Sequence, residues 1–191
     1  MPRVRTVPAR ELSGKAREVY DRSSNYGPFS GLVDAMANRP PVLEHMFGLL
    51  LDLKAEGVLA TRYLELALVT VSKLNACTFC VSSHTPRLTA SGISVAAAEN
   101  ILDYKAIPEF DEVDRLVIEY SIAFTNDFHR VRDAMFDRLR KHFDDAQIVE
   151  LTVVAGRLAQ RDRSARLREQ RIDAPLGFSR YFICLCVVFA A

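Results

Sequence analysis

Residues 61–84 read TRYLELALVTVSKLNACTFCVSSH, and this stretch decides the fold. Its first half is apolar on nearly every side, and Glu65 is the one charge between residues 63 and 71, a pattern typical of a buried helix. Asn75 interrupts the pattern, and a second helix is predicted to follow and to end before Gly92. Because only a short turn separates the two helices, we expect them to pack antiparallel, as in a helical bundle.

Polar residues are expected to cap both helices. Thr61 precedes the first and Asn75 the second, and side chains of both types accept hydrogen bonds from free amides at helix starts. This assignment places Cys77 in the first turn of the second helix. The unpaired amides and the positive end of the helix dipole favour thiolate over thiol at that position.

The rest of the chain also has helical spacing of apolar residues, and there is no pair of alternating runs joined by a hairpin turn and no βαβ rhythm. The sequence therefore predicts an all-α fold, a compact multi-helix bundle. Three parts are expected: an N-terminal segment at 1–24, a helical domain at 25–156, and an Arg-rich then apolar tail at 157–191. Further helices are predicted at 8–22, 42–55, 94–102, 111–125, 131–143 and from 145 past 155.

Composition argues against several classes of function. The formal net charge of +1 gives no overall attraction to nucleic acid or to anionic membranes. The arginines of the tail lack the interleaved aromatic residues of a nucleic-acid surface. The late apolar run at 181–191 is shorter than the roughly 20 residues of a membrane-spanning helix. No apolar leader follows Met1, so a cytoplasmic protein without nucleic-acid or membrane partners is expected.

Two close cysteine pairs stand out in a chain expected to be cytoplasmic, where structural disulfides are rare. Cys77 and Cys80 form a C-x-x-C, and Cys184 and Cys186 form a C-x-C. Such pairs indicate redox chemistry or metal binding. The second pair is expected to be buried or incidental. Three histidines have no comparable neighbours and are expected to be structural or exposed: His45, His129 and His142.

Cys77, Cys80 and His84 fall within an arc of roughly 60° on a helix, because each residue turns about 100°. Two thiols and an imidazole would then share one patch. Glu65, on the preceding helix, would lie beside it, and a buried carboxyl group is a natural proton acceptor for a thiol, directly or through the histidine. The arrangement predicts a dithiol catalyst.

Three alternatives stay open. The first is a zinc site formed by the two cysteines, His84 and a carboxylate. The second is a helical partner-binding protein in which the cysteines only pack. The third is chemistry on a small acid that uses Glu65 and His84 without thiol turnover.

The spacing Glu65-x11-Cys77-x2-Cys80-x3-His84 resembles the alkylhydroperoxidase D-like branch of the carboxymuconolactone decarboxylase family, and the likeness extends over roughly residues 25–155. The resemblance implies an all-α fold, homo-oligomers that are often trimers or hexamers, and no required metal or organic cofactor. It also implies reduction of a hydroperoxide: Cys80 attacks, Cys77 resolves the product as a disulfide, and Glu65 and His84 relay protons. A thiol protein or a lipoyl-bearing protein would supply electrons.

One position departs from this pattern. Some peroxidatic members carry a histidine between the two cysteines, where this chain has Phe79, so a shorter proton relay and weaker peroxide turnover are expected. Decarboxylase members act on a lactone ring and typically lack the cysteine pair. Redox chemistry is therefore favoured over the alternatives of a decarboxylase-like enzyme on a small carboxylic acid or lactone, or a zinc-binding helical protein.

Overall fold

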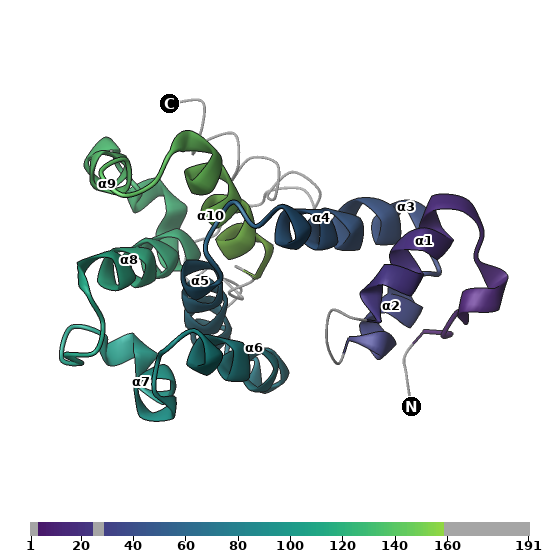
Figure 1. The fold of residues 1–191 in the computed structure, drawn as a ribbon, viewed down its shortest axis with the longest axis horizontal. Coiled ribbons are helices and arrows are strands. Elements are labelled where there is room, and N and C mark those ends of the chain that lie inside the picture. Colours follow the sequence, from purple (N-terminus) through teal and green to yellow (C-terminus); the bar gives the residue numbers. More distant parts are fainter. Residues whose placement is uncertain (1–3, 25–28, 159–191) are drawn as a thin grey trace, which may run out of the picture. The chain divides into compact units, whose positions relative to one another are not determined.

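The computed structural model describes residues 4–24 and 29–158, so nearly all of the tail predicted at 157–191 lies outside the described residues. All regular structure in the described ranges is helical, which confirms the predicted all-α class (Figure 1). The chain divides into two compact units, residues 1–58 and 59–191. The domain boundaries expected near residues 24 and 156 stay predictions.

The first unit packs short helices around a small core that includes Val19, Leu43 and Phe47. Gly57 ends its last helix in the left-handed conformation, with φ at 65°, which is the usual role of glycine at a helix end. The helix predicted at 42–55 is present but contains a π-helical turn, and the one predicted at 8–22 is split. In order, the elements are a 3₁₀ turn Ala9–Glu11, α1 (Gly14–Ser23), α2 (Ser30–Met36), α3 (Pro40–Val42), the π-helical turn Leu43–Phe47 and α4 (Gly48–Glu56).

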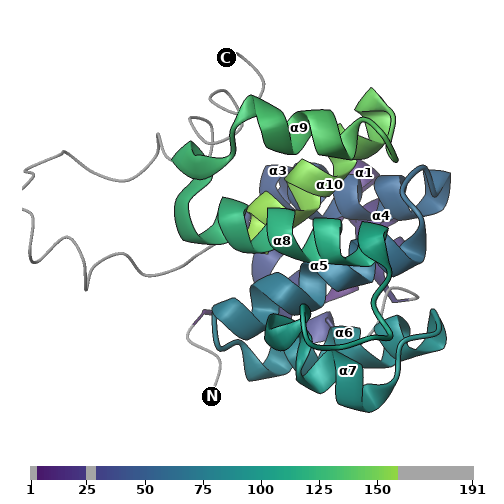
Figure 2. The same cartoon turned by 90° about the vertical axis from the view of Figure 1, so that its left-hand side faces the viewer.

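The second unit is built around α5, which packs against α6, α8 and α10 (Figures 1 and 2). Leu66, Leu68 and Val71 of α5 are fully buried, as the apolar pattern of this helix predicts. Its elements are α5 (Thr61–Leu74), α6 (Thr78–Ala90), α7 (Val95–Glu99), a 3₁₀ turn Ile101–Asp103, α8 (Glu112–Asp127), a 3₁₀ turn Phe128–Arg130, α9 (Asp133–Leu139) and α10 (Asp145–Leu158).

A buried ion pair fixes the start of α5 against α8. The guanidinium of Arg62 donates two hydrogen bonds to Asp114, of 2.8 and 2.5 Å, and a third to the carbonyl of Ser91 beyond the end of α6. Asp114 is fully buried and forms a capping box with Asp111 at the start of α8, as the predicted Asp111 cap requires. The hydrogen bond to Asp114 raises the pKa of Arg62.

The predicted cap at Thr61 is wrong. Ala60 occupies the N-cap position, and its carbonyl already accepts hydrogen bonds from Tyr63 and Leu64, so Thr61 is the first helical residue. The ion pair between Arg62 and Asp114 anchors this turn instead. In the part of the chain that the structure describes, no helix combines the length and the apolar character needed to span a membrane.

Candidate active site

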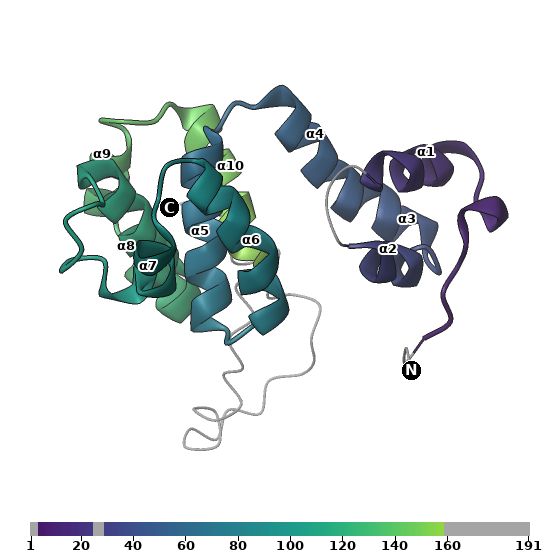
Figure 3. The same ribbon diagram turned by 60° about the horizontal axis from the view of Figure 1, so that its bottom comes forward.

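The turn between α5 and α6 places the cysteines, and α6 folds back against α5 from it (Figure 3). Asn75 ends α5, and Cys77 is the N-cap of α6. The predicted Asn75 cap, with Cys77 inside the first turn, is therefore wrong. The reason lies in the backbone: the amides of Asn75, Ala76 and Cys77 donate to carbonyls of the last turns of α5, so α6 cannot begin until after Cys77.

Ala76 is left-handed, with φ at 52°, in the middle of this turn. A Cβ in that conformation costs roughly 1 kcal/mol, which glycine avoids. We expect Ala76→Gly to raise the free energy of unfolding by about 0.5–1 kcal/mol in urea denaturation. Ala96→Gly, at an exposed position inside α7, should lower it by a similar amount. Equal destabilisation by both substitutions would contradict the assignment of backbone strain to Ala76.

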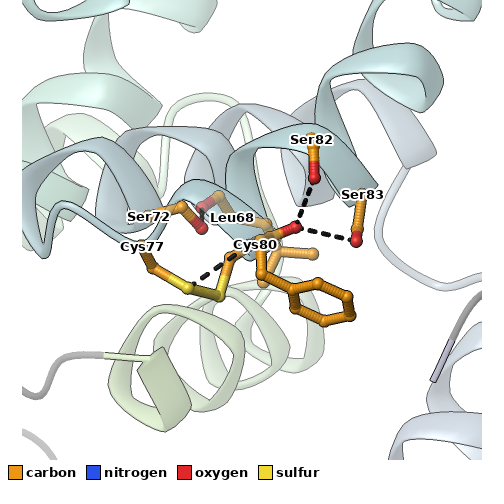
Figure 4. Close-up of a disulfide and its surroundings, with 7 residues drawn as sticks. Leu68, Ser72, Cys77, Cys80, Ser82 and Ser83 are labelled. Carbon is orange, nitrogen blue, oxygen red and sulfur yellow. Dashed lines mark hydrogen bonds between the residues drawn. A yellow bond between two sulfur atoms is a disulfide. The ribbon is translucent and has the colours of Figure 1, made fainter.

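Cys77 and Cys80 are joined by a disulfide across the start of α6 (Figure 4). Their Cα atoms are 5.3 Å apart, well within the range that a disulfide spans. The amide of Cys80 donates to the Cys77 sulfur at 3.3 Å, so this sulfur takes the place of a capping oxygen. Both residues are half-buried, which leaves part of the pair open to solvent.

Glu65 and His84 form a second, buried pair. Oε2 of Glu65 lies 2.8 Å from Nδ1 of His84, and each side chain is 4% exposed. The glutamate comes from α5 and the histidine from α6, so the packing expected from the sequence brings them together. Cys80 and His84 are four residues apart on α6 and therefore neighbours on one face. The structure gives a hydrogen bond within each pair, from the amide of Cys80 to the sulfur of Cys77 and between His84 and Glu65.

Sequence reasoning missed Arg87. Its Nη1 lies 3.9 Å from Oε1 of Glu65, whereas Oε2 is the oxygen that lies 2.8 Å from His84, and the Arg87 side chain is 25% exposed. The signal was available, because Arg87 follows His84 by three residues and so shares its helix face. The site therefore contains a cation beside the carboxylate.

Phe79 lies between the cysteines with its side chain 52% exposed. Its backbone carbonyl accepts hydrogen bonds from the hydroxyls of Ser82 and Ser83, of 2.9 and 2.8 Å, which both appear in Figure 4. These bonds tie the first turn of α6 to the second. A phenyl ring cannot carry a proton, so Phe79 cannot serve as a proton relay.

His45, His129 and His142 are exposed, and Cys184 and Cys186 lie outside the described residues. Among the described residues, no group of three or more His, Cys, Asp or Glu side chains could hold a metal ion. The predicted zinc alternative finds no support in this geometry, because both sulfurs are bonded to each other.

A helical fold with a cysteine pair at a helix start and a buried carboxylate–imidazole pair beside it defines a class of thiol-bearing all-α proteins. Residues 40–120 match the model of the carboxymuconolactone decarboxylase family. The matched family is the one expected from the spacing, and the matched segment holds Glu65, Cys77, Cys80 and His84.

Two curated proteins and one solved structure are similar to the chain. The uncharacterized protein YdfG of Bacillus subtilis is 25% identical over 49% of this chain and 65% of its own length. The uncharacterized protein YnjA of Escherichia coli is 29% identical over 45% of this chain and 47% of its own length. Both matches thus cover less than two thirds of the relative.

The solved structure is an alkylhydroperoxidase AhpD core, an uncharacterized peroxidase-related protein from Ralstonia eutropha JMP134. It superposes with a TM-score of 0.68, covering 86% of this chain and 88% of that one, at 20% identity. At this level of identity the likeness establishes a shared fold.

Proposed function

We propose that this protein is a thiol-dependent peroxidase, a disulfide oxidoreductase that reduces hydroperoxides through the Cys77–Cys80 dithiol. The observation that carries the proposal is the disulfide itself, half-buried at a helix start and one helical turn from a buried Glu65–His84 pair. A structural disulfide needs no proton acceptor beside it, whereas a dithiol that cycles between oxidation states does.

The oxidative half-reaction begins with the reduced pair. Glu65 and His84 take the proton of Cys80, and the thiolate attacks the distal oxygen of the hydroperoxide. The O–O bond breaks, the alcohol leaves with a proton, and Cys80 becomes a sulfenic acid. The sulfur of Cys77 then attacks that of Cys80, a disulfide forms, and water leaves.

The reductive half-reaction returns two electrons. An external dithiol attacks the disulfide, passes through a mixed disulfide, and leaves as its own oxidised form. A thiol or lipoyl-bearing protein fits this role, and no metal or organic cofactor takes part. The exposure of Phe79 beside the sulfurs supports contact with such a partner. Assembly into a homo-oligomer, a trimer or hexamer, belongs to the same proposal.

The structural neighbour supports the proposal, because it is described as a peroxidase-related protein with an alkylhydroperoxidase core. The family model carries the name of a decarboxylase. A reaction on a lactone does not use two cysteines that form a disulfide. The geometry therefore favours thiol redox chemistry over decarboxylation.

Mass spectrometry of the tryptic peptide 74–87 tests the proposal, because cleavage after Lys73 and Arg87 leaves both cysteines on one fragment. Reduced protein should accept two alkyl groups on this peptide. After one equivalent of an organic hydroperoxide it should accept none, because the disulfide has formed, and a dithiol should restore both. The corresponding alcohol, which lacks the O–O bond, is the control. Two alkylatable thiols that persist after hydroperoxide would refute the proposed function.

A further inference from the structure

We propose that Arg87 is a positioning residue of this site: it anchors one oxygen of Glu65, so that the other holds His84 in the tautomer that leaves Nε2 able to accept a proton. The proposal rests on the function proposed above for the Glu65–His84 pair. It concerns a residue that neither the sequence pattern nor the family spacing singles out.

The two carboxylate oxygens of Glu65 have different partners. Oε2 meets Nδ1 of His84 at 2.8 Å, and Oε1 lies 3.9 Å from Nη1 of Arg87. Both partners come from α6, one helical turn apart, while Glu65 comes from α5. The carboxylate is thus held from two sides, and rotation about its last torsion would disrupt both interactions together.

The tautomer follows from the hydrogen-bond inventory. An ionised carboxylate only accepts hydrogen bonds, so Nδ1 of a neutral imidazole must carry the hydrogen that it donates to Oε2. Nε2 is then the ring nitrogen with a lone pair, and it is the one that can take a proton from a thiol. Glu65 can hold the ring in this state before the thiol reacts only while the orientation of its own carboxylate is fixed.

Arg87 suits this anchoring role because a guanidinium keeps its charge at any working pH. Glu65 is almost wholly buried, and a buried carboxylate that loses a cationic partner is poorly solvated. It can respond by rotating away from Nδ1. An imidazole without that acceptor is no longer held in the Nδ1–H form.

The test measures the tautomer of the His84 ring directly. The sample is the oxidised chain labelled with ¹⁵N-histidine, at about pH 8, where an ordinary histidine is neutral. Side-chain ¹⁵N NMR distinguishes the two tautomers, and His84→Gln identifies the signals of His84 among those of the four histidines. The variants are Arg87→Met, Arg87→Gln and Arg87→Lys. Arg138→Met is the matched control, because Arg138 pairs with Glu119 on other helices of the same unit.

We expect the Nδ1–H form of His84 to predominate in the unmodified chain. Its population relative to the other tautomer should fall by roughly threefold or more in Arg87→Met and Arg87→Gln, the scale of a half-buried ion pair. Arg87→Lys should restore it, and Arg138→Met should leave it unchanged. Unchanged His84 signals in a folded Arg87→Gln protein would overturn the proposal, and so would equal changes in Arg138→Met.

This readout is separate from hydroperoxide turnover. A chain that shows the tautomer change but no peroxide-driven disulfide keeps the role of Arg87 and loses the proposed function. A chain that shows peroxide-driven disulfide formation but no tautomer change keeps the proposed function and loses the role of Arg87.

Discussion

Cys80→Ser should lower dithiol-dependent hydroperoxide reduction by on the order of 10³-fold or more, because a serine hydroxyl cannot form the covalent intermediate. Cys80 lies one helical turn from His84, whose ring is hydrogen-bonded to the buried Glu65. Serine preserves the shape of the side chain, so the loss would reflect chemistry. The measurement is a coupled assay that follows consumption of a dithiol such as dihydrolipoamide in the presence of an organic hydroperoxide.

Cys77→Ser is the matched control and should give a different signature. Cys80 would still react once, but without a resolving sulfur it would stop at the sulfenic acid, which dimedone traps and mass spectrometry detects. A sulfenic acid on Cys77 in the Cys80→Ser protein, with none on Cys80 in the Cys77→Ser protein, would show that Cys77 attacks the hydroperoxide and Cys80 resolves the product. Turnover at the unmodified rate in Cys80→Ser would eliminate the mechanism.

Asp114→Asn should lower the free energy of unfolding by about 3 kcal/mol, the low end of the range for removing one partner of a buried pair. The Asp114 side chain is fully buried, whereas Arg62 is 27% exposed and can regain some hydration, so the full penalty is not expected. The substitution also weakens the capping box at Asp111. Urea denaturation followed by circular dichroism measures the change.

Glu119→Gln provides the comparison on the same helix. Glu119 also accepts two hydrogen bonds from an arginine, Arg138, but its side chain is 37% exposed and that of Arg138 is 48% exposed, so the loss should stay below about 1 kcal/mol. Similar losses for the two substitutions would show that burial does not set the strength of these pairs.

The stability that the Glu119–Arg138 pair contributes should change with pH in one direction. The hydrogen bonds from Arg138 lower the pKa of Glu119. A depressed pKa in the folded state contributes stability above the unfolded value, near 4.3, and that contribution is lost as pH falls through the folded value. The stability difference between the unmodified chain and Glu119→Gln should therefore be present at neutral pH and disappear in acid.

Much of the fold could be predicted because hydrophobic pattern and helix punctuation agree. The apolar run in α5, the stop at Gly57 and the cap at Asp111 each specify the element that the structure contains. The sequence also predicted that Glu65 would lie beside the face of α6 that carries Cys80 and His84, because two helices joined by a short turn can pack antiparallel, and in the structure Glu65 contacts His84.

The caps that failed depend on backbone hydrogen bonds, and the anchoring ion pair on a long-range contact, and the side-chain pattern encodes neither. A cap side chain is worth about 1 kcal/mol, less than the backbone bonds that extend α5 through Asn75 and move the start of α6 past Cys77. The pair between Arg62 and Asp114 joins residues 52 positions apart. Arg87 was within reach of sequence reasoning, but the search for proton carriers among Cys, His and Glu passed over a cation that does not titrate.

The disulfide at the start of α6 joins residues only three positions apart. Closing so short a loop removes little freedom from the unfolded chain, and the loop-entropy relation gives about 2 kcal/mol, compared with nearly 5 for a loop of about 100 residues. The buried core of the second unit does not include either sulfur. Opening this bond should therefore lower the free energy of unfolding only slightly, so the scaffold can stay folded in both the oxidised and the reduced form. The proposed turnover requires this property, whereas a permanent cross-link does not.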